Sequence, residues 1–251
     1  MSLLKRLGLC LVALLGCAAP AYAAEVAVAV AANFSAPMHK IAALFEADTG
    51  HKTRLAFGST GRFYAQIQNG APFDLLLAAD ADTPARLERM GLGVVGSRFT
   101  YAIGRLVLWS HQPDLVDDQG AVLKRGGFSK LAVANPKLAP YGAAAVETLS
   151  QLGLYDALKP RLVQGDSIAQ AYQFVATENA ELGFVALSQV QIDGRISAGS
   201  AWLVPDHLHT PIRQDALLLV KGQANPAASA LLQYLRGAKA RAVLQASGYA
   251  F

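Results

Sequence analysis

The stretch VAVAVAANFSAPMHKIAALFEADTG, residues 26–50, contains the pattern that decides the fold. Its first five residues alternate valine and alanine, which is typical of a short buried strand. Beyond a turn, apolar residues recur at helical spacing, at Met38, Ile41, Leu44 and Phe45. Gly50 then supplies a residue on which a helix can end. A strand followed by a turn and a helix is the first half of a βαβ unit.

Further strand and helix patterns alternate along the chain. Strands are predicted at TRLAF (53–57), FDLLLAAD (73–80), KLAVANP (130–136), RLVQG (161–165) and LGFVAL (182–187). Helices are predicted over 63–69, from Thr83 as cap with Pro84 as first residue, from about Tyr141 and from about Ser167. Two longer strands, 99–110 and 214–222, separate these blocks, and two helices follow to the C-terminus.

This order predicts an α/β protein of two hinged lobes. Each lobe is expected to be a mostly parallel sheet flanked by helices, and two crossover strands would join the lobes. Lobe I would comprise residues 24–104 and 212–251, and lobe II residues 105–211.

Residues 1–23 have the features of an export signal. Lys5 and Arg6 precede an apolar run, and Ala21-Tyr22-Ala23 is a small-x-small cleavage site. The run is too short to span a membrane. An alternative is that LLGC, ending at Cys17, is a lipobox and that Cys17 carries a lipid. Either route places the exported chain outside the cytoplasm, and we expect it in the periplasm.

The composition excludes several kinds of site. Both cysteines lie in the export signal, so a chain cut after Ala23 has neither a cysteine nucleophile nor a cysteine metal ligand. The formal net charge of +4 comes from scattered basic residues with no interleaved aromatics, which argues against a nucleic-acid partner. No G-x-S-x-G elbow is present. His207 and His209 form the only close histidine pair, and we expect them in an exposed loop.

Four turns at the ends of predicted strands carry polar residues. They are Ala32-Asn33-Phe34-Ser35, Gly58-Ser59-Thr60-Gly61, Ala139-Pro140-Tyr141-Gly142 and Asp166-Ser167-Ile168. Ligands of open α/β sheets bind beyond such strand ends, where helices begin. Two turns belong to each predicted lobe, so facing lobes would bring all four into one cleft. Hydroxyls, an amide and backbone N–H groups there suit a small anion.

Each turn also has a purely structural interpretation. Asn33, Ser35, Ser59, Thr60 and Ser167 are all residue types that cap helices. Tyr141 taken alone is more typical of a packed aromatic side chain. Capping and ligand binding are compatible, so the two interpretations stay open at this point.

The chain resembles the periplasmic molybdate-binding proteins of ABC importers, within the type II solute-binding fold. The resemblance rests on AVAANFSAPMHKIAALFEADTGHK, FGSTGRFYAQIQNGAPFDLLLAAD, SRFTYAIGRLVLW, ANPKLAPYG and ELGFVAL, which occur in the family's order. It covers nearly all of the chain beyond the export signal.

The resemblance implies which residues contact an oxyanion. In lobe I they would be Asn33 with the Ala32 backbone, and Thr60 next to Ser59. In lobe II they would be Tyr141 and the backbone N–H of Ile168. Ser35 would then be the structural cap. The sequence departs from many family members in having Asn33 in place of Ser, and Ala186 where a tyrosine hydroxyl is common. Tyr141 could supply that hydroxyl from a neighbouring loop.

The resemblance also implies the function. The protein would capture molybdate or tungstate through neutral hydrogen-bond donors, close over it and deliver it to an ABC permease. It would be a monomer without cofactor or catalytic activity, and molybdenum would be held as the oxyanion with no direct metal ligand. Alternatives are the same fold binding sulfate or another small anion, a lipid-anchored sensor, and a secreted hydrolase or metal-dependent enzyme.

Overall fold

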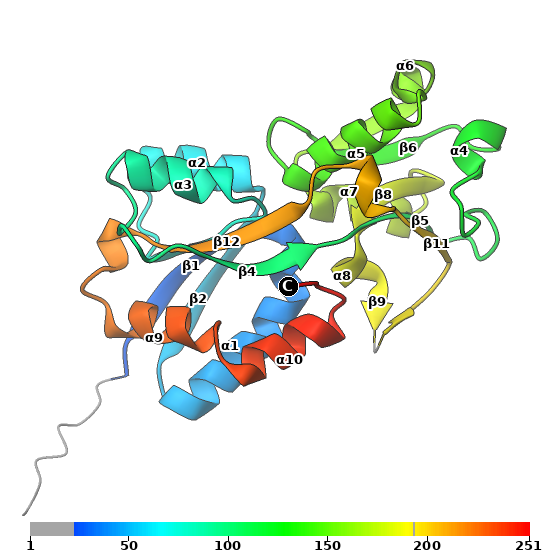
Figure 1. Cartoon of the computed structure of the whole chain (residues 1–251). Coiled ribbons are helices and arrows are strands. Elements are labelled where there is room, and N and C mark those ends of the chain that lie inside the picture. Colours follow the sequence, from blue (N-terminus) through cyan, green and yellow to red (C-terminus); the bar gives the residue numbers. More distant parts are fainter. Residues whose placement is uncertain (1–22, 193) are drawn as a thin grey trace, which may run out of the picture.

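The computed structural model describes residues 23–192 and 194–251, which fold into two α/β lobes side by side (Figure 1). The predicted export signal up to residue 22, with Cys17, lies outside these residues. Within the described part of the chain, no helix combines the length and the apolar character needed to cross a membrane.

The first lobe is built on a five-stranded sheet in the order β2-β1-β3-β12-β4. Its strands are β1 (Glu25–Ala31), β2 (Lys52–Gly58), β3 (Leu75–Leu77), β4 (Phe99–Gly104) and β12 (Ile212–Leu218). β1 pairs in parallel with β2 and β3, whereas β12 is antiparallel to both of its neighbours. The short segment η4 (Val220–Gly222) follows β12.

Helices cover both faces of this sheet. α2 (Thr60–Gln68) and α3 (Asp82–Arg89) lie on one face, and α1 (Ser35–Thr49), α9 (Pro226–Tyr234) and α10 (Ala238–Ala246) lie on the other (Figure 1). Each face has its own apolar core, one around Phe45 and Leu231 and the other around Phe63 and Leu87. The burial of β1 on both faces explains its unbroken apolar sequence.

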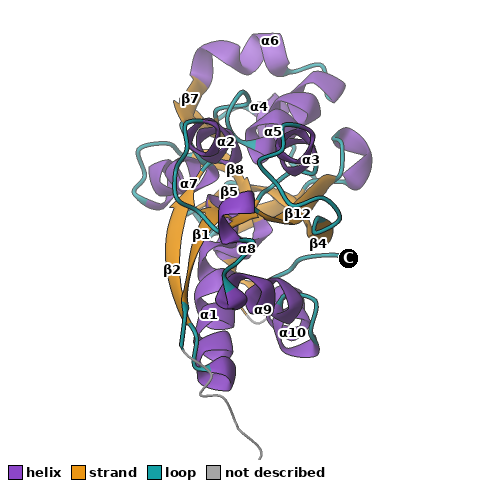
Figure 2. Ribbon diagram, turned by 90° about the vertical axis from the view of Figure 1, so that its left-hand side faces the viewer, coloured by secondary structure: helices purple, strands orange, loops and turns teal. Residues whose placement is uncertain are grey.

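The second lobe has the sheet order β11-β5-β8-β6-β7. Its strands are β5 (Leu106–Ser110), β6 (Leu131–Ala134), β7 (Leu162–Gly165), β8 (Leu182–Ala186) and β11 (Ser200–Leu203). The main helices are α5 (Pro140–Gln151) and α7 (Ile168–Ala176). Shorter elements are α4 (Val122–Arg125), α6 (Tyr155–Leu158), η2 (Lys159–Arg161), α8 (Leu187–Val190), η3 (Asp206–Leu208) and the pair β9 (Gln191–Ile192) and β10 (Arg195–Ile196). In Figure 2, α6 marks one end of the molecule, and α1, α9 and α10 gather at the other.

The predicted fold class is confirmed, because each sheet has four strands running one way and a single antiparallel strand, β12 or β5. The strand predicted over 99–110 is interrupted at Arg105, where the chain passes from one sheet to the other. The carbonyl of Arg105 accepts the N–H of Leu187 there. The strand predicted over 214–222 instead spans 212–218. We propose these two passages, at 105 and at 204–211, as the hinge between lobe I (24–104 and 212–251) and lobe II (105–211).

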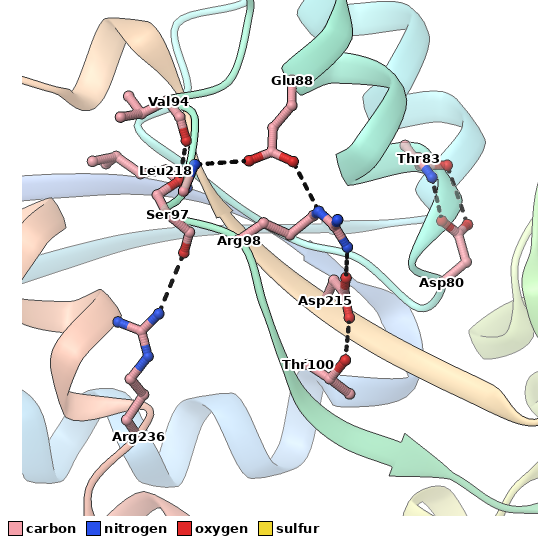
Figure 3. Close-up of polar contacts among 11 residues, drawn as sticks. Asp80, Thr83, Glu88, Val94, Ser97, Arg98, Thr100, Asp215, Leu218 and Arg236 are labelled. Atoms are coloured by element: carbon pink, nitrogen blue, oxygen red, sulfur yellow. Dashed lines mark hydrogen bonds and ion pairs between the residues drawn. The ribbon is translucent and has the colours of Figure 1, made fainter.

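The helix starts differ from the predictions in three places, the first being α2, which begins at Thr60 and not at residue 63. A 3-10 turn, η1 (Ala32–Phe34), precedes α1, so Ser35 is already helical, and the capping position at Phe34 makes no side-chain bond. The prediction of Ser35 as cap was therefore wrong. Thr83 also lies inside a helix, because α3 begins at Asp82. The Asp80 carboxylate accepts the Thr83 N–H at 2.7 Å and stabilises that first turn (Figure 3).

A buried ion pair anchors β12 against β4 (Figure 3). The register of the two strands shifts between Gln214 and Asp215. The Asp215 carboxylate, 1% exposed, accepts from Arg98 Nη1 at 2.7 Å and from Thr100 Oγ1 at 2.7 Å. Successive strand residues face opposite sides of a sheet, so Asp215 faces Arg98 while Gln214 faces the other way, toward the second lobe. The ion pair thereby holds Gln214 in place.

Candidate functional site

The four turns predicted from the sequence converge where the lobes meet. Ala32, Tyr141 and Ile168 belong to one buried apolar cluster, which also includes Ala79. The second turn is tied to the same cluster, because Thr60 Oγ1 accepts the N–H of Ala79 at 2.9 Å. All six predicted site residues therefore lie around one junction between the two sheets.

Ser59 carries an unused buried hydroxyl. It stands just before α2 with its backbone in the β region, and its side chain makes no capping bond. The residue is 3% exposed, and its Oγ has no hydrogen-bond partner among residues 23–192 and 194–251. Leaving a buried polar group unpaired costs about 1–3 kcal/mol. The oxygen of Thr60 accepts from Ala79, which leaves its own proton free, so the hydroxyls of Ser59 and Thr60 can both donate to a ligand.

Tyr141 brings a phenol from the second lobe to the first. It lies in the first turn of α5, is 1% exposed, and its oxygen accepts from Gln214 Nε2 at 3.1 Å. Burial raises the pKa of Tyr141 well above its usual range, although the Gln214 and Asn33 amides act in the opposite direction. The phenol therefore keeps its proton at neutral pH and can donate it.

The side chain of Asn33 is directed into the protein rather than into the cleft. Its Nδ2 donates to Gln214 Oε1 at 2.9 Å and to the Tyr249 hydroxyl at 3.0 Å. Both amide hydrogens are therefore used in this arrangement. The donors left at this turn are the backbone N–H groups of Ala32 and Asn33, which open η1 and so lack an acceptor within it.

Ile168 is the first residue of α7, and the side chain of the preceding residue, Ser167, caps this helix. As predicted for a cap, Ser167 Oγ accepts the N–H of Gln170 at 3.3 Å. The N–H of Ile168 is thus one of the first-turn groups without an intrahelical acceptor. Together with α2, α5 and the η1–α1 segment, α7 directs a positive helix end toward the junction.

The lobes are closed on each other in this structure. The N–H of Gly61 donates to the carbonyl of Leu138 at 2.9 Å, and Ser188 Oγ donates to the carbonyl of Asn33 at 2.8 Å. Both bonds join the first lobe to the second. A Cβ on Gly61 would lie 3.0 Å from the Leu138 Cα, so glycine permits this close approach.

Charged groups lie at the rim of the junction. Arg62 Nη1 is 3.6 Å from Asp166 Oδ2, and both side chains are more than half exposed. A cavity of about 560 Å³ opens beside the Gly61–Leu138 contact and is lined in part by Asp80, whose pKa is raised by burial. The junction itself is built from neutral dipoles, which can hold a small anion without a paired cation.

Four polar residues that support the site do not stand among those predicted from the sequence. Gln214, Tyr249 and Tyr101 are buried. The Tyr101 hydroxyl donates to Gln214 Oε1, and the Tyr249 hydroxyl lies within hydrogen-bond distance of the Asn33 carbonyl and of Ser188 Oγ in α8. Gln214 had a visible signal, because it is a polar residue just before the apolar run of a predicted buried strand. Tyr249 had none, since only the fold brings the C-terminus beside Asn33.

The histidine pair makes no metal site. His207 is exposed, as predicted, but His209 is only 9% exposed, contrary to the prediction, and its Nδ1 is 2.8 Å from the Thr210 carbonyl. Among the residues with described positions, no group of three histidine, cysteine or acidic side chains could hold a metal ion.

Comparison with known proteins agrees with this architecture. Residues 26–250 match the family model described as bacterial extracellular solute-binding protein. The molybdate-binding protein ModA of Azotobacter vinelandii is 64% identical over 236 residues, covering 94% of this chain and 93% of that protein. The ModA of Rhodobacter capsulatus is 52% identical over 94% of this chain and 92% of that protein. A solved Azotobacter vinelandii periplasmic molybdate-binding protein superposes with a TM-score of 0.87 at 42% identity, covering 90% of this chain and 99% of that one.

Proposed function

Since the chain belongs to the family of bacterial extracellular solute-binding proteins, we propose that it binds molybdate in the periplasm for an ABC transporter. Membership of this family makes it a binding protein and not an enzyme. We further propose that the oxyanion is held between the lobes by Ser59, Thr60, Tyr141 and the backbone N–H groups of Ala32, Asn33 and Ile168.

The observation that carries this proposal is the buried Ser59 hydroxyl, which lacks a protein partner among the described residues. An oxyanion at the junction would supply the missing acceptor. The protonated Tyr141 phenol and the starts of α2, α5 and α7 supply further donors around the same place. All these groups are neutral, so the site would accept a dianion without enclosing a positive side chain.

The energetics suit a tight complex. A hydrogen bond to a charged group contributes about 1.5–3 kcal/mol, and micromolar binding needs about 8 kcal/mol. Six such donors exceed that amount even after the costs of desolvation and lobe closure. Because the donors come from two lobes, binding and closure are coupled, and the ligand stabilises the closed form.

Size is the property by which this ring of donors would select its ligand. Molybdate, tungstate and sulfate carry the same charge, but the bonds to oxygen are longer in the first two. A closed shell of fixed donors can favour the larger anions over sulfate. The closed protein would then dock on its membrane permease as a monomer.

Replacing Ser59 by alanine tests the site directly. We expect the Ser59→Ala variant to bind molybdate about tenfold to 100-fold more weakly, because one hydrogen bond to the anion is lost. Its unfolding midpoint without ligand is expected to be no lower than that of the wild type, since no protein contact is removed and an unpaired buried hydroxyl is lost. Calorimetric titration and thermal unfolding measure the two quantities.

Ser150→Ala is the matched control. Its hydroxyl bonds to the Val146 carbonyl on the exposed side of α5, away from the junction. We expect wild-type affinity for this control. Equal affinities of the Ser59→Ala and Ser150→Ala variants would contradict the assignment of Ser59.

A further inference from the structure

We propose that Gln214 is a positioning residue that directs the Tyr141 hydroxyl proton toward the bound oxyanion when the lobes close. The inference rests on the proposed function and adds a residue that contacts no ligand itself. It follows from the hydrogen-bond directions in a buried chain that runs from Tyr249 through Asn33 and Gln214 to Tyr141.

The directions in this chain are fixed from one end. The backbone carbonyl of Asn33 can only accept, and it receives the Tyr249 hydroxyl at 3.0 Å. The other acceptor within reach of that proton, Ser188 Oγ at 3.2 Å, also lies away from the Asn33 side chain. The Tyr249 oxygen can therefore only accept a hydrogen bond from the Asn33 side chain, and Asn33 Nδ2 donates it at 3.0 Å.

The second hydrogen of the same amide group then determines how Gln214 is turned. Asn33 Nδ2 donates to Gln214 Oε1 at 2.9 Å, and Tyr101 donates to the same oxygen at 2.9 Å. A carbonyl oxygen with two donors has used both lone pairs. Gln214 must therefore present its Nε2 on the other side, where it donates to the Tyr141 oxygen at 3.1 Å.

The Tyr141 oxygen thus accepts from Gln214, and the Tyr141 hydroxyl proton is free to donate to another acceptor. Among the described residues we find no protein acceptor for that proton, which leaves the junction between the helix starts. In the closed form this donor is held toward the anion by its bond to Gln214, and this favours the closed complex.

The arrangement also depends on closure. Gln214 in β12, Asn33 in η1 and Tyr249 after α10 belong to the first lobe, whereas Tyr141 belongs to the second. The bond from Gln214 to Tyr141 exists only when the two lobes meet. The hydroxyl therefore becomes a directed donor in the closed form, and in the open form it can rotate.

The groups that face Gln214 do not titrate near neutral pH. They are the phenols of Tyr101, Tyr141 and Tyr249, and burial raises the pKa of each well above its usual range. The nearby carboxyls are those of Asp215 and Asp80, whose charges help to raise the pKa of Tyr101. Wild-type titrations run in parallel account for any contribution from these two carboxyls.

A Gln214→Glu substitution tests the proton direction. A carboxylate at this position cannot donate, so the Tyr141 proton would turn toward it and away from the ligand. We expect molybdate affinity at about pH 8 to fall at least about tenfold below wild type. Burial raises the pKa of a carboxyl, and its protonated form has one O–H to give to Tyr141. Affinity should therefore recover as the pH is lowered to about 5.5, while wild-type affinity changes little.

A Gln214→Met variant serves as the control without charge or titration. It should lose affinity by the same factor at both pH values. A double-mutant cycle with Tyr141→Phe keeps the test decisive if the Gln214→Glu variant does not fold. If Gln214 acts through the Tyr141 hydroxyl, Gln214→Met should weaken binding in the wild-type background and have no further effect in the Tyr141→Phe background.

Two results would overturn the inference. One is a Gln214→Glu variant that binds as weakly at about pH 5.5 as at about pH 8. The other is a cycle in which the effects of Gln214→Met and Tyr141→Phe add. Wild-type protein that fails to bind molybdate would instead contradict the proposed function, so the two failures are distinguishable.

Discussion

A Gly104→Ala variant is expected to bind molybdate about 100-fold more weakly than the wild type while both lobes stay folded. Gly104 ends β4, and the Tyr141 hydroxyl lies directly over it. A Cβ at this position would overlap that hydroxyl and lie 2.5 Å from Gln214 Nε2. Tyr141 is buried and cannot move aside, so the overlap with its hydroxyl disappears only if the lobes open, whereas the overlap with Gln214, in the same lobe as Gly104, stays.

The size of this effect follows from two costs. Overpacking a buried contact costs about 1–3 kcal/mol, and losing the Tyr141 hydrogen bond to the anion costs about 1.5–3 kcal/mol. Together they amount to about 3 kcal/mol or more, which corresponds to about 100-fold in Kd. Calorimetric titration measures the affinity, and small-angle scattering with molybdate shows whether the lobes close.

The Gly104→Ala/Tyr141→Phe double variant separates the clash from the lost bond. Removing the hydroxyl takes away the nearest overlap but leaves the added Cβ 2.5 Å from Gln214 Nε2 and 2.9 Å from the ring carbon Cζ. The double variant should therefore bind more tightly than Gly104→Ala and more weakly than Tyr141→Phe. Gly237→Ala, at a glycine of negative φ before α10, is the matched control and should keep wild-type affinity. A Gly104→Ala variant that closes and binds like the control would contradict this account of the junction.

Replacing Arg98 by alanine is expected to lower the free energy of unfolding by about 3 kcal/mol. Breaking a buried ion pair by removing one partner leaves an uncompensated charge, which costs about 3–5 kcal/mol. Asp215 is only 1% exposed, but the Arg98 side chain is 37% exposed, so water can partly replace it. The lower end of the range therefore applies, and chemical denaturation measures it.

Arg54→Ala is the control for a lost arginine. Arg54 pairs with Glu25 at 2.9 Å, but both side chains are more than half exposed. Exposed pairs contribute about 0–1 kcal/mol, so this control should lose little stability. Equal losses in the Arg98→Ala and Arg54→Ala variants would show that the buried pair does not anchor β12.

The fold could be predicted from sequence because local patterns and global topology agree. Residues 26–50 alternate as a strand, turn at Asn33 and continue as a helix to Gly50, and the structure follows this order through β1, η1 and α1. The interruption at Arg105 was not predicted, because apolar residues continue on both sides of Gly104 and Arg105. The strand divides there because the chain leaves one sheet and enters the other, which is a property of the whole fold.

The candidate site was predictable at the level of turns and not of individual atoms. The rule that ligands bind at strand ends located Ser59, Tyr141 and Ile168 near one another. Which atoms remain free depends on distant partners. Asn33 bonds to Gln214 across 181 positions of the chain, and no local pattern records that contact. We therefore propose that the backbone N–H of Asn33, and not its side chain, donates to the ligand.

The most direct test of the central claim is calorimetric titration of the ligand-free protein, beginning at Ala24, with molybdate, tungstate and sulfate. A neutral site that closes around the larger oxyanions predicts tight one-to-one binding of molybdate and tungstate and no measurable heat of binding with sulfate. Equal binding of sulfate would contradict selection by size and leave only the fold. Absence of binding to all three anions would contradict the oxyanion site itself.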